Sequence, residues 1–164
     1  MATVFLFRGL PGSGKSTLIR SLALERFAVV SPDYERAAHP LVKDEENGFL
    51  VYDQAVSRLA WENTYLRLGL AVADGQDVVF DATFMSIGTL RDAMKHIGNN
   101  ADVVIVDFFG DVDEATAKER NRNRWGTPAF VPDFVIHRMA RNGAKMDLSG
   151  YTVISPADFV RIAG

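Results

Sequence analysis

Cysteine, long apolar runs and a recognisable leader segment are missing from this sequence. Without cysteine the chain can form no disulfide, thiolate metal site or cysteine nucleophile, which fits a reducing compartment. No stretch approaches the roughly 18–20 apolar residues that span a bilayer. Residues 1–7 lack the basic start and the cleavage site of a signal peptide. We therefore expect a cytoplasmic protein with no membrane partner.

An overall excess of positive charge is also missing, because the net charge is −3 at pH 7. The chain therefore has no global basic field that would attract nucleic acid. Basic residues do gather in one C-terminal stretch, at Arg120, Arg122, Arg124, Arg138, Arg141 and Lys145. Any binding of nucleic acid must use this local patch. The length of 164 residues predicts one compact domain over 1–164.

Short apolar runs alternate with helical patterns along the chain, which predicts an α/β fold with a mostly parallel five-stranded sheet. We expect strands at Thr3–Phe7, Phe27–Val30, Asp77–Phe80, Val103–Phe108 and Tyr151–Ile154. We expect helices at Lys15–Arg26, about 50–70, Leu90–His96, Asp113–Arg124 and Pro132–Met146, with a helical turn at Asp158–Ile162. A polar region, 39–49, precedes the long helix.

The segment after the first expected strand has the pattern of a phosphate-binding loop. Residues 9–17 read Gly-Leu-Pro-Gly-Ser-Gly-Lys-Ser-Thr and match G-x-x-x-x-G-K-[ST], the P-loop or Walker A motif. The glycines let backbone N–H groups converge on phosphate oxygens, and the following helix adds its positive end. Lys15 should reach the β- and γ-phosphates of ATP, and the Ser16 hydroxyl should hold Mg²⁺. The predicted nucleotide-binding residues are Gly9, Gly12, Ser13, Gly14, Lys15, Ser16 and Thr17.

An acidic residue follows the second expected strand, where a parallel sheet places its ligands. Asp33 is therefore predicted to face the γ-phosphate, where a carboxylate can orient an attacking hydroxyl and accept its proton. Arg36 lies one helical turn further on and can bind a phosphate. The alternative is that Asp33 only caps a short helix.

Two strands end in an acid that could serve a metal site. Asp81 closes the apolar run 77–81, which has the shape of a Walker B strand, so it is a candidate for holding Mg²⁺. Asp107 closes a similar run at 104–107, so the pattern alone does not separate the two. An ordinary strand-end aspartate is the alternative for either.

Three arginines within five residues predict a lid over about 118–132. On one continuous helix Arg120 and Arg124 would share a face, whereas Arg122 would point elsewhere. Guanidinium groups suit the charge that develops on a transferring phosphoryl group. The alternative is a solvated charged helix with internal salt bridges.

In this order, from about residue 3 to residue 146, the motifs resemble the kinase domain of phage polynucleotide 5′-hydroxyl kinases, within the wider group of P-loop kinases. The loop at 9–17 is similar to that family's G-x-P-G-S-G-K-S-T, and Asp33-x-x-Arg36 is similar to its D-x-x-R acceptor motif. Asp81-Ala-Thr83 resembles its strand-end D-x-T segment. Residues 120–124 and 131–132 resemble its R-N-x-x-R lid and the V-P helix start.

The resemblance implies roles for these residues. Asp33 would be the general base for a nucleic-acid 5′-hydroxyl, and Arg36 would hold the 3′-phosphate of the acceptor nucleotide. Lys15 and one lid arginine, Arg124 by preference, would stabilise the transition state. Arg120 would bind the nucleotide. The resemblance also implies a phage-encoded or bacterial enzyme of nucleic-acid repair or modification.

The segment after Asp81 departs from the family pattern. Thr83 and Phe84 are expected at the acceptor side, although Phe84 stands where the family commonly has Asn and could equally be a packing residue. The expected activity is transfer of the ATP γ-phosphate to the 5′-hydroxyl of DNA or RNA. Alternatives are a kinase for a hydroxymethylated base in phage DNA, a kinase for a small metabolite, and an ATP-binding switch without an acceptor.

Overall fold

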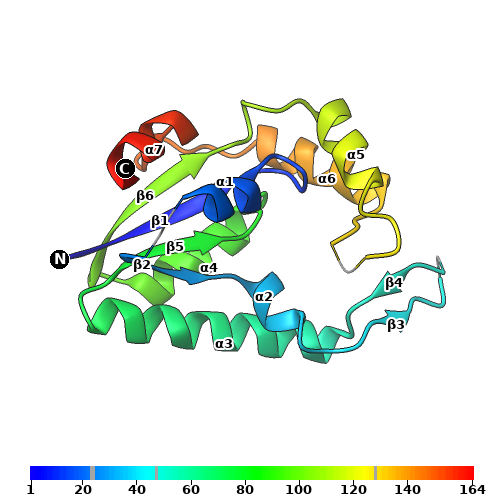
Figure 1. Ribbon diagram of the computed structural model, residues 1–164, viewed down its shortest axis with the longest axis horizontal. Coiled ribbons are helices and arrows are strands. Elements are labelled where there is room, and N and C mark those ends of the chain that lie inside the picture. The colour runs from blue at the N-terminus through cyan, green and yellow to red at the C-terminus, as the bar shows by residue number, and fades with distance from the viewer. Residues whose placement is uncertain (23–24, 47, 128) are drawn as a thin grey trace.

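A parallel sheet of five strands lies at the centre of the computed structural model, which describes residues 1–22, 25–46, 48–127 and 129–164 (Figure 1). The strands are β1 (Ala2–Arg8), β2 (Phe27–Val30), β5 (Asp77–Asp81), β6 (Ala101–Asp107) and β7 (Thr152–Ile154), in the order β2-β5-β1-β6-β7. Val4 of β1 pairs with Val78 of β5 on one side and with Val103 of β6 on the other. The five expected strands are confirmed, with small shifts at their ends.

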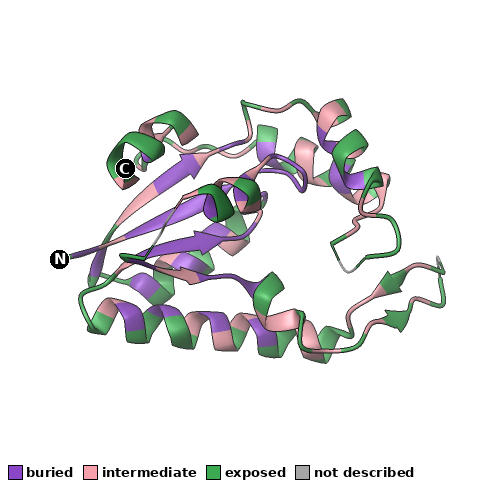
Figure 2. Cartoon of the chain, viewed as in Figure 1, coloured by how far each residue is buried: buried purple, intermediate pink, exposed green. Residues whose placement is uncertain are grey.

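Helices cover both faces of this sheet and give a three-layer architecture, in agreement with the predicted α/β fold. On one face α3 (Gln54–Ala73) and α4 (Ile87–Ile97) pack against Leu6 and Phe80. On the other face α1 (Lys15–Ser21) and α7 (Pro156–Ala163) pack against Phe5 and Phe7. Figure 2 shows β1 and β5 buried along most of their length, which explains their continuous apolar sequences. Within the described parts of the chain, no helix is long and apolar enough to cross a membrane.

The long third helix starts later than expected. Asp53 caps α3 by accepting a hydrogen bond from the backbone N–H of Ala55, so the helix begins at Gln54 rather than near residue 50. Residues Leu50–Val51 instead form β4, which pairs antiparallel with β3 (Val42–Lys43). This hairpin was not predicted, because strands of two residues carry no readable alternation of apolar and polar residues.

Three further helices lie at the carboxyl edge of the sheet, where the functional residues gather. They are α2 (Pro32–Arg36), α5 (Glu114–Arg122) and α6 (Asp133–Ala144). Leu10, Met85, Ala117 and Ile136 form a small core that holds α5 and α6 to this edge. Because α5 ends at Arg122, the expected extension to Arg124 is wrong. Residue 128 of the expected lid lies outside the described residues.

The other helix boundaries differ by less. The described part of α1 ends at Ser21, whereas the sequence predicted a helix to Arg26, and residues 23–24 of that range lie outside the described residues. The helix α4 is longer than expected, and Gly98, with a φ of 58°, lies at its C-cap. The terminal helix α7 extends beyond the expected turn because Ser155 caps it.

Candidate active site

The loop between β1 and α1 has the backbone geometry that a phosphate-binding loop requires. Gly12 and Gly14 have φ angles of 82° and 101°, which side chains with a Cβ rarely adopt. A Cβ added at Gly12 would also lie 2.8 Å from the carbonyl oxygen of Ala117 in α5. The N–H of Gly9 donates to the Thr83 carbonyl at 3.0 Å and thereby ties the loop to the segment after β5.

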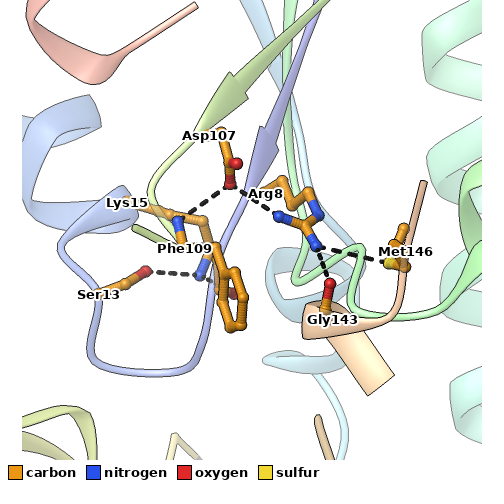
Figure 3. A network of polar contacts seen from close by, with 8 residues as sticks. Arg8, Ser13, Lys15, Asp107, Phe109, Gly143 and Met146 are labelled. Carbon is orange, nitrogen blue, oxygen red and sulfur yellow. Dashed lines mark hydrogen bonds and ion pairs between the residues drawn. The ribbon is translucent and has the colours of Figure 1, made fainter. Parts of the chain in front are cut away.

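Lys15, the first residue of α1, is folded back into this loop. Its side-chain nitrogen donates to the carbonyl oxygens of Gly9 and Leu10 at 2.8 and 3.0 Å, and to Ser13 Oγ at 3.3 Å (Figure 3). Burial lowers the pKa of Lys15 to about 8, although the carboxylate of Asp81 acts in the opposite direction. The ammonium group is therefore a buried charge that titrates not far above neutral pH.

Parallel pairing of β1 with β5 brings Asp81 beside the loop, because Phe7 and Asp81 are partners in the register. Ser16 Oγ lies 3.3 Å from Asp81 Oδ2. Burial raises the pKa of Asp81, whereas the charge of Lys15 lowers it. The hydroxyl and the carboxylate form a hard oxygen pair that suits Mg²⁺. Within the described ranges, His, Cys, Asp and Glu side chains form no group of three or more that could hold a metal ion.

Asp33 and Arg36 lie together on the short helix α2, directly after β2. Arg36 Nη1 pairs with Asp33 Oδ1 at 2.7 Å, and Arg36 Nε donates to Ser57 Oγ in α3 at 3.3 Å. The Asp33 side chain is 84% exposed, whereas that of Arg36 is 18% exposed. Asp33 also contributes to the raised pKa of Asp81, after burial as the main cause, so it faces the same charged site.

The alternative interpretation of Asp33 as a helix cap is wrong. Ser31 occupies the N-cap position of α2, and Asp33 is the second residue inside the helix. Its carboxylate pairs with Arg36 and is otherwise open to solvent. The carboxylate is therefore available to a ligand at the carboxyl edge of the sheet.

The three lid arginines have different surroundings, and only two of them act on the phosphate site. Arg120 Nη1 donates to the Gly12 carbonyl at 3.1 Å, so α5 contacts the loop directly. Arg122 points away and pairs with Asp133 Oδ2 of α6 at 3.0 Å. Arg124 lies in the turn after α5, and its charge contributes to lowering the pKa of Lys15, for which burial is the main cause. The prediction that Arg120 and Arg124 share one helix face is therefore wrong, although both act on the phosphate site.

Asn121 is a structural residue of the lid that the sequence analysis did not identify. Its side chain is fully buried, accepts a hydrogen bond from the Val131 N–H at 2.9 Å and donates to the Val131 carbonyl. These two bonds join the end of α5 to the segment before α6 and close the loop that carries Arg124. The Arg-Asn pair at residues 120–121 marked this position in the sequence, but the sequence did not indicate that Val131 is the partner of the asparagine.

A comparison with known protein families identifies a match over most of the chain. A family model described as an AAA domain matches residues 4–145. The chain belongs to the AAA domain family. This match covers the phosphate loop, α2, the end of β5 and the lid. No curated protein sequence matches the chain.

Several solved structures share the architecture of this AAA domain. A chain of the Pnkp1/Rnl/Hen1 RNA repair complex superposes with a TM-score of 0.71 at 20% identity, over 89% of the AAA domain chain and 46% of the other. A sugar kinase from Janibacter sp. HTCC2649 gives a TM-score of 0.62 at 15% identity, over 99% and 92%. A gluconokinase from Sinorhizobium meliloti 1021 gives 0.55 at 17% identity, over 98% and 89%.

These likenesses establish a P-loop kinase-type fold. The family match and the similarity to the RNA repair chain agree with the P-loop kinase fold that the resemblance implied. The AAA domain chain spans less than half of the length of the chains that it matches in that complex.

The segment after β5 in the AAA domain differs from the expectation. Phe84 is fully buried and packs its ring edge-on against Phe80, with ring centroids 5.0 Å apart. Its φ of 48° turns the chain so that the side chain enters the core. The prediction that Phe84 contacts the acceptor is therefore wrong. Thr83 is half-buried at the site, and its carbonyl holds the phosphate loop.

Asp107, the second candidate for the metal site, has a structural partner instead. It pairs with Arg8 Nη1 at 2.9 Å and accepts a hydrogen bond from the Phe109 N–H at 3.0 Å (Figure 3). Arg8 is 2% exposed and donates to the carbonyl oxygen of Gly143 in α6 at 2.7 Å. The sequence analysis missed Arg8, which connects the strand before the phosphate loop to the helix after the lid.

Proposed function

We propose that the chain is an ATP-dependent kinase that transfers the γ-phosphate to the 5′-hydroxyl of a DNA or RNA strand. The observation that carries this proposal is the Asp33–Arg36 pair, an exposed carboxylate held 2.7 Å from a cation at the edge where Lys15 and Asp81 meet. A bound nucleotide needs neither group there. An acceptor nucleotide with a 5′-hydroxyl and a 3′-phosphate would use both groups. The carboxylate of Asp33 would contact the hydroxyl, and the guanidinium of Arg36 would contact the phosphate.

In this proposal Asp33 accepts the proton of the 5′-hydroxyl while the hydroxyl oxygen attacks the γ-phosphorus. The new bond joins the 5′-oxygen to phosphorus, and the bond between the γ-phosphorus and the β–γ bridging oxygen breaks, so that ADP leaves. Lys15 and Arg124 stabilise the charge on the phosphoryl oxygens, and Arg120 keeps the lid against the loop. Positioning and electrostatics therefore supply most of the rate enhancement.

The oxygen pair of Ser16 and Asp81 fits a bound Mg²⁺ ion, and these are the residues that would hold it. When bound, Mg²⁺ neutralises charge on the phosphate oxygens. The 3.3 Å approach of the two side chains shows that no rearrangement of the sheet is needed to bring them together.

Arg36 has the role of an acceptor-binding residue in this proposal. Ser57 orients the guanidinium through Nε, and Asp33 takes Nη1, which leaves further N–H donors for a phosphate. The similarity to a chain of an RNA repair complex supports a nucleic-acid acceptor. A nucleoside 3′-monophosphate should accordingly be a better acceptor than the nucleoside alone, and Arg36→Ala should remove that difference.

The experiment that tests the proposal uses labelled ATP and an oligonucleotide with a free 5′-hydroxyl. Asp33→Asn should lower kcat by about 10²–10⁴-fold, the usual contribution of a positioned general base, while ATP binding is retained. Glu35→Gln is the matched control, because Glu35 lies on the same helix but pairs with Arg67 of α3 at 2.6 Å. If Asp33→Asn keeps near-normal transfer, the assignment of the base is wrong.

A kinase for a small hydroxyl compound is the second candidate. The sugar kinase and the gluconokinase match over most of their own length, whereas the RNA repair chain is more than twice as long as the matched region. A panel of 5′-hydroxyl oligonucleotides, hydroxymethyl-base DNA, gluconate and simple sugars separates the candidates by the product that carries the label. ATP hydrolysis unaffected by every acceptor would instead indicate a switch.

A further inference from the structure

We propose that an aromatic groove beside the candidate active site stacks a nucleobase of the acceptor strand, 3′ of the nucleotide that is phosphorylated. This inference rests on the proposed function. The aromatic groove has a volume of about 640 Å³ and is lined by Phe49, Arg122, Trp125, Phe130, Pro132, Asp133 and Phe134. Its volume falls within the range of about 300–1,000 Å³ that is usual for small-ligand sites.

Three separate segments build the aromatic groove. Phe49 comes from the β3–β4 hairpin, Trp125 and Phe130 come from the lid, and Phe134 comes from the first turn of α6. Trp125 lies edge-on to Phe130 and to Phe49, with centroid distances of 4.9 and 6.2 Å. In Figure 1 the β3–β4 hairpin and the loop between α5 and α6 lie at the same end of the molecule, with the loop above the hairpin. The aromatic contacts therefore join the acceptor side to the lid.

Two of the aromatic side chains in the groove remain exposed although the rings contact one another. Trp125 is 68% exposed and Phe134 is 56% exposed, although both line a concave surface. Exposed aromatic side chains that gather in one groove are typical of interaction sites. Single-stranded nucleic acid is bound by such rings, because every base has a flat π-face that stacks on an aromatic side chain.

The position of the aromatic groove fits a strand that leaves the proposed acceptor site. Phe49 belongs to the hairpin that follows α2, the helix of Asp33 and Arg36. Trp125 is the neighbour of Arg124, whose charge acts on the phosphate site. The segments that build the aromatic groove are thus continuous in the chain with those that carry Asp33, Arg36 and Arg124.

The polar members of the groove suit the edge of a base. Arg122 and Asp133 form an ion pair at 3.0 Å, and their side chains are only partly covered, at 65% and 44% exposure. The guanidinium offers N–H donors and the carboxylate offers acceptors. Stacking rings together with a hydrogen-bond donor and an acceptor suit a heterocyclic base. The positive charges of Arg122 and Arg124 suit the phosphodiester backbone of the strand.

The test compares a short 5′-hydroxyl oligonucleotide with the same strand carrying abasic positions 3′ of the first nucleotide. For the wild-type protein, the intact strand should have the lower KM. Trp125→Ala should raise the KM for the intact strand by roughly 5- to 150-fold, the range for the loss of one stacked base. Trp125→Phe should keep most of the advantage because a ring remains. Leu66→Ala, at an exposed leucine of α3, is the control and should change neither KM.

Fluorescence gives a readout that is independent of phosphate transfer. The chain has two tryptophans, Trp61 and Trp125, so Trp61→Phe leaves Trp125 as the only reporter. The intact oligonucleotide should quench its emission saturably without ATP, and the abasic strand should not. Equal quenching by both strands, or an unchanged KM in Trp125→Ala, overturns the inference. Base-dependent quenching without any 5′-labelling would support the groove and overturn the proposed function. Labelling without a base effect would do the reverse.

Discussion

Binding of ATP should draw a proton onto Lys15. In the unliganded chain this side chain is 8% exposed, and burial lowers its pKa from 10.5 to about 8. Holding the charged form in the loop therefore costs roughly 3 kcal/mol relative to water. The negative charges of a bound triphosphate favour the ammonium form and should return the pKa to its ordinary range. A neutral Lys15 must then gain a proton when the nucleotide binds.

The size of this uptake follows from the pKa. With a pKa of about 8, Lys15 is neutral in about one tenth of molecules at pH 7, one half at pH 8 and nine tenths at pH 9. Proton uptake should rise in the same proportions. The terminal phosphate of a nucleotide is largely ionised at pH 8 and 9, because a phosphate monoester has its second pKa near 6, so the comparison of these two pH values isolates Lys15. Calorimetric titration with a non-hydrolysable analogue, in two buffers of different ionisation enthalpy, measures the number of protons directly.

Lys15→Arg is the matched control. Arginine keeps the positive charge but does not titrate below pH 12, so the pH-dependent uptake should disappear. Any proton released when Asp81 binds Mg²⁺ has the opposite sign and remains visible in this variant. Uptake that persists in Lys15→Arg, or no uptake in the wild-type protein at pH 9, would refute the reasoning.

Three other predictions concern the loop, the buried ion pair and the metal. In urea unfolding, Gly14→Ala should cost about 1–3 kcal/mol through its positive φ alone, and Gly12→Ala should cost more because its Cβ also meets the Ala117 carbonyl. Arg8→Met should destabilise the fold by about 3 kcal/mol by leaving Asp107 without its cation, and adding Asp107→Asn should recover part of that loss. Chelation of Mg²⁺ should stop transfer, and Asp81→Asn should raise the Mg²⁺ concentration for half-maximal activity roughly 10- to 100-fold.

Each of these three predictions has its own result that would contradict it. Equal stability of the two glycine variants would show that the Ala117 carbonyl moves away freely. An Arg8→Met protein as stable as the wild type would mean that water solvates Asp107, which is 25% exposed, well enough to replace the pair. Unchanged Mg²⁺ dependence in Asp81→Asn would remove Asp81 from the metal site.

The ATP side of the site could be predicted because its determinants are local in sequence. The nine residues 9–17 contain both the glycines with positive φ and the side chains of Lys15 and Ser16. Asp81 followed from the Walker B shape of the run 77–81, and the register of Phe7 with Asp81 places it beside the loop. Local signals of this kind survive without knowledge of the tertiary contacts.

Features that depend on long-range contacts were missed. Arg8 belongs to a strand that reads as apolar, and its partners Asp107 and Gly143 are about 100 and 135 positions away. Phe49 and Trp125 lie in two different loops, and their contact depends on the hairpin that the two-residue strands β3 and β4 form. Phe84 was misplaced because a positive φ at a non-glycine residue is uncommon and is decided by the surrounding packing.

The attachments of the two lid arginines suggest a division of labour between them. Arg120 is fixed by the Gly12 carbonyl, an atom of the loop backbone, so its position is set before any ligand binds. Arg124 lies in a loop whose ends are joined by Asn121 and Val131, and its charge acts on both Lys15 and Asp81. A cation that is held by the loop backbone suits ground-state positioning of the lid. A cation presented from a closed loop, near the metal-binding pair, suits the charge that develops on the transferring phosphoryl group. This difference favours Arg124 over Arg120 as the catalytic arginine.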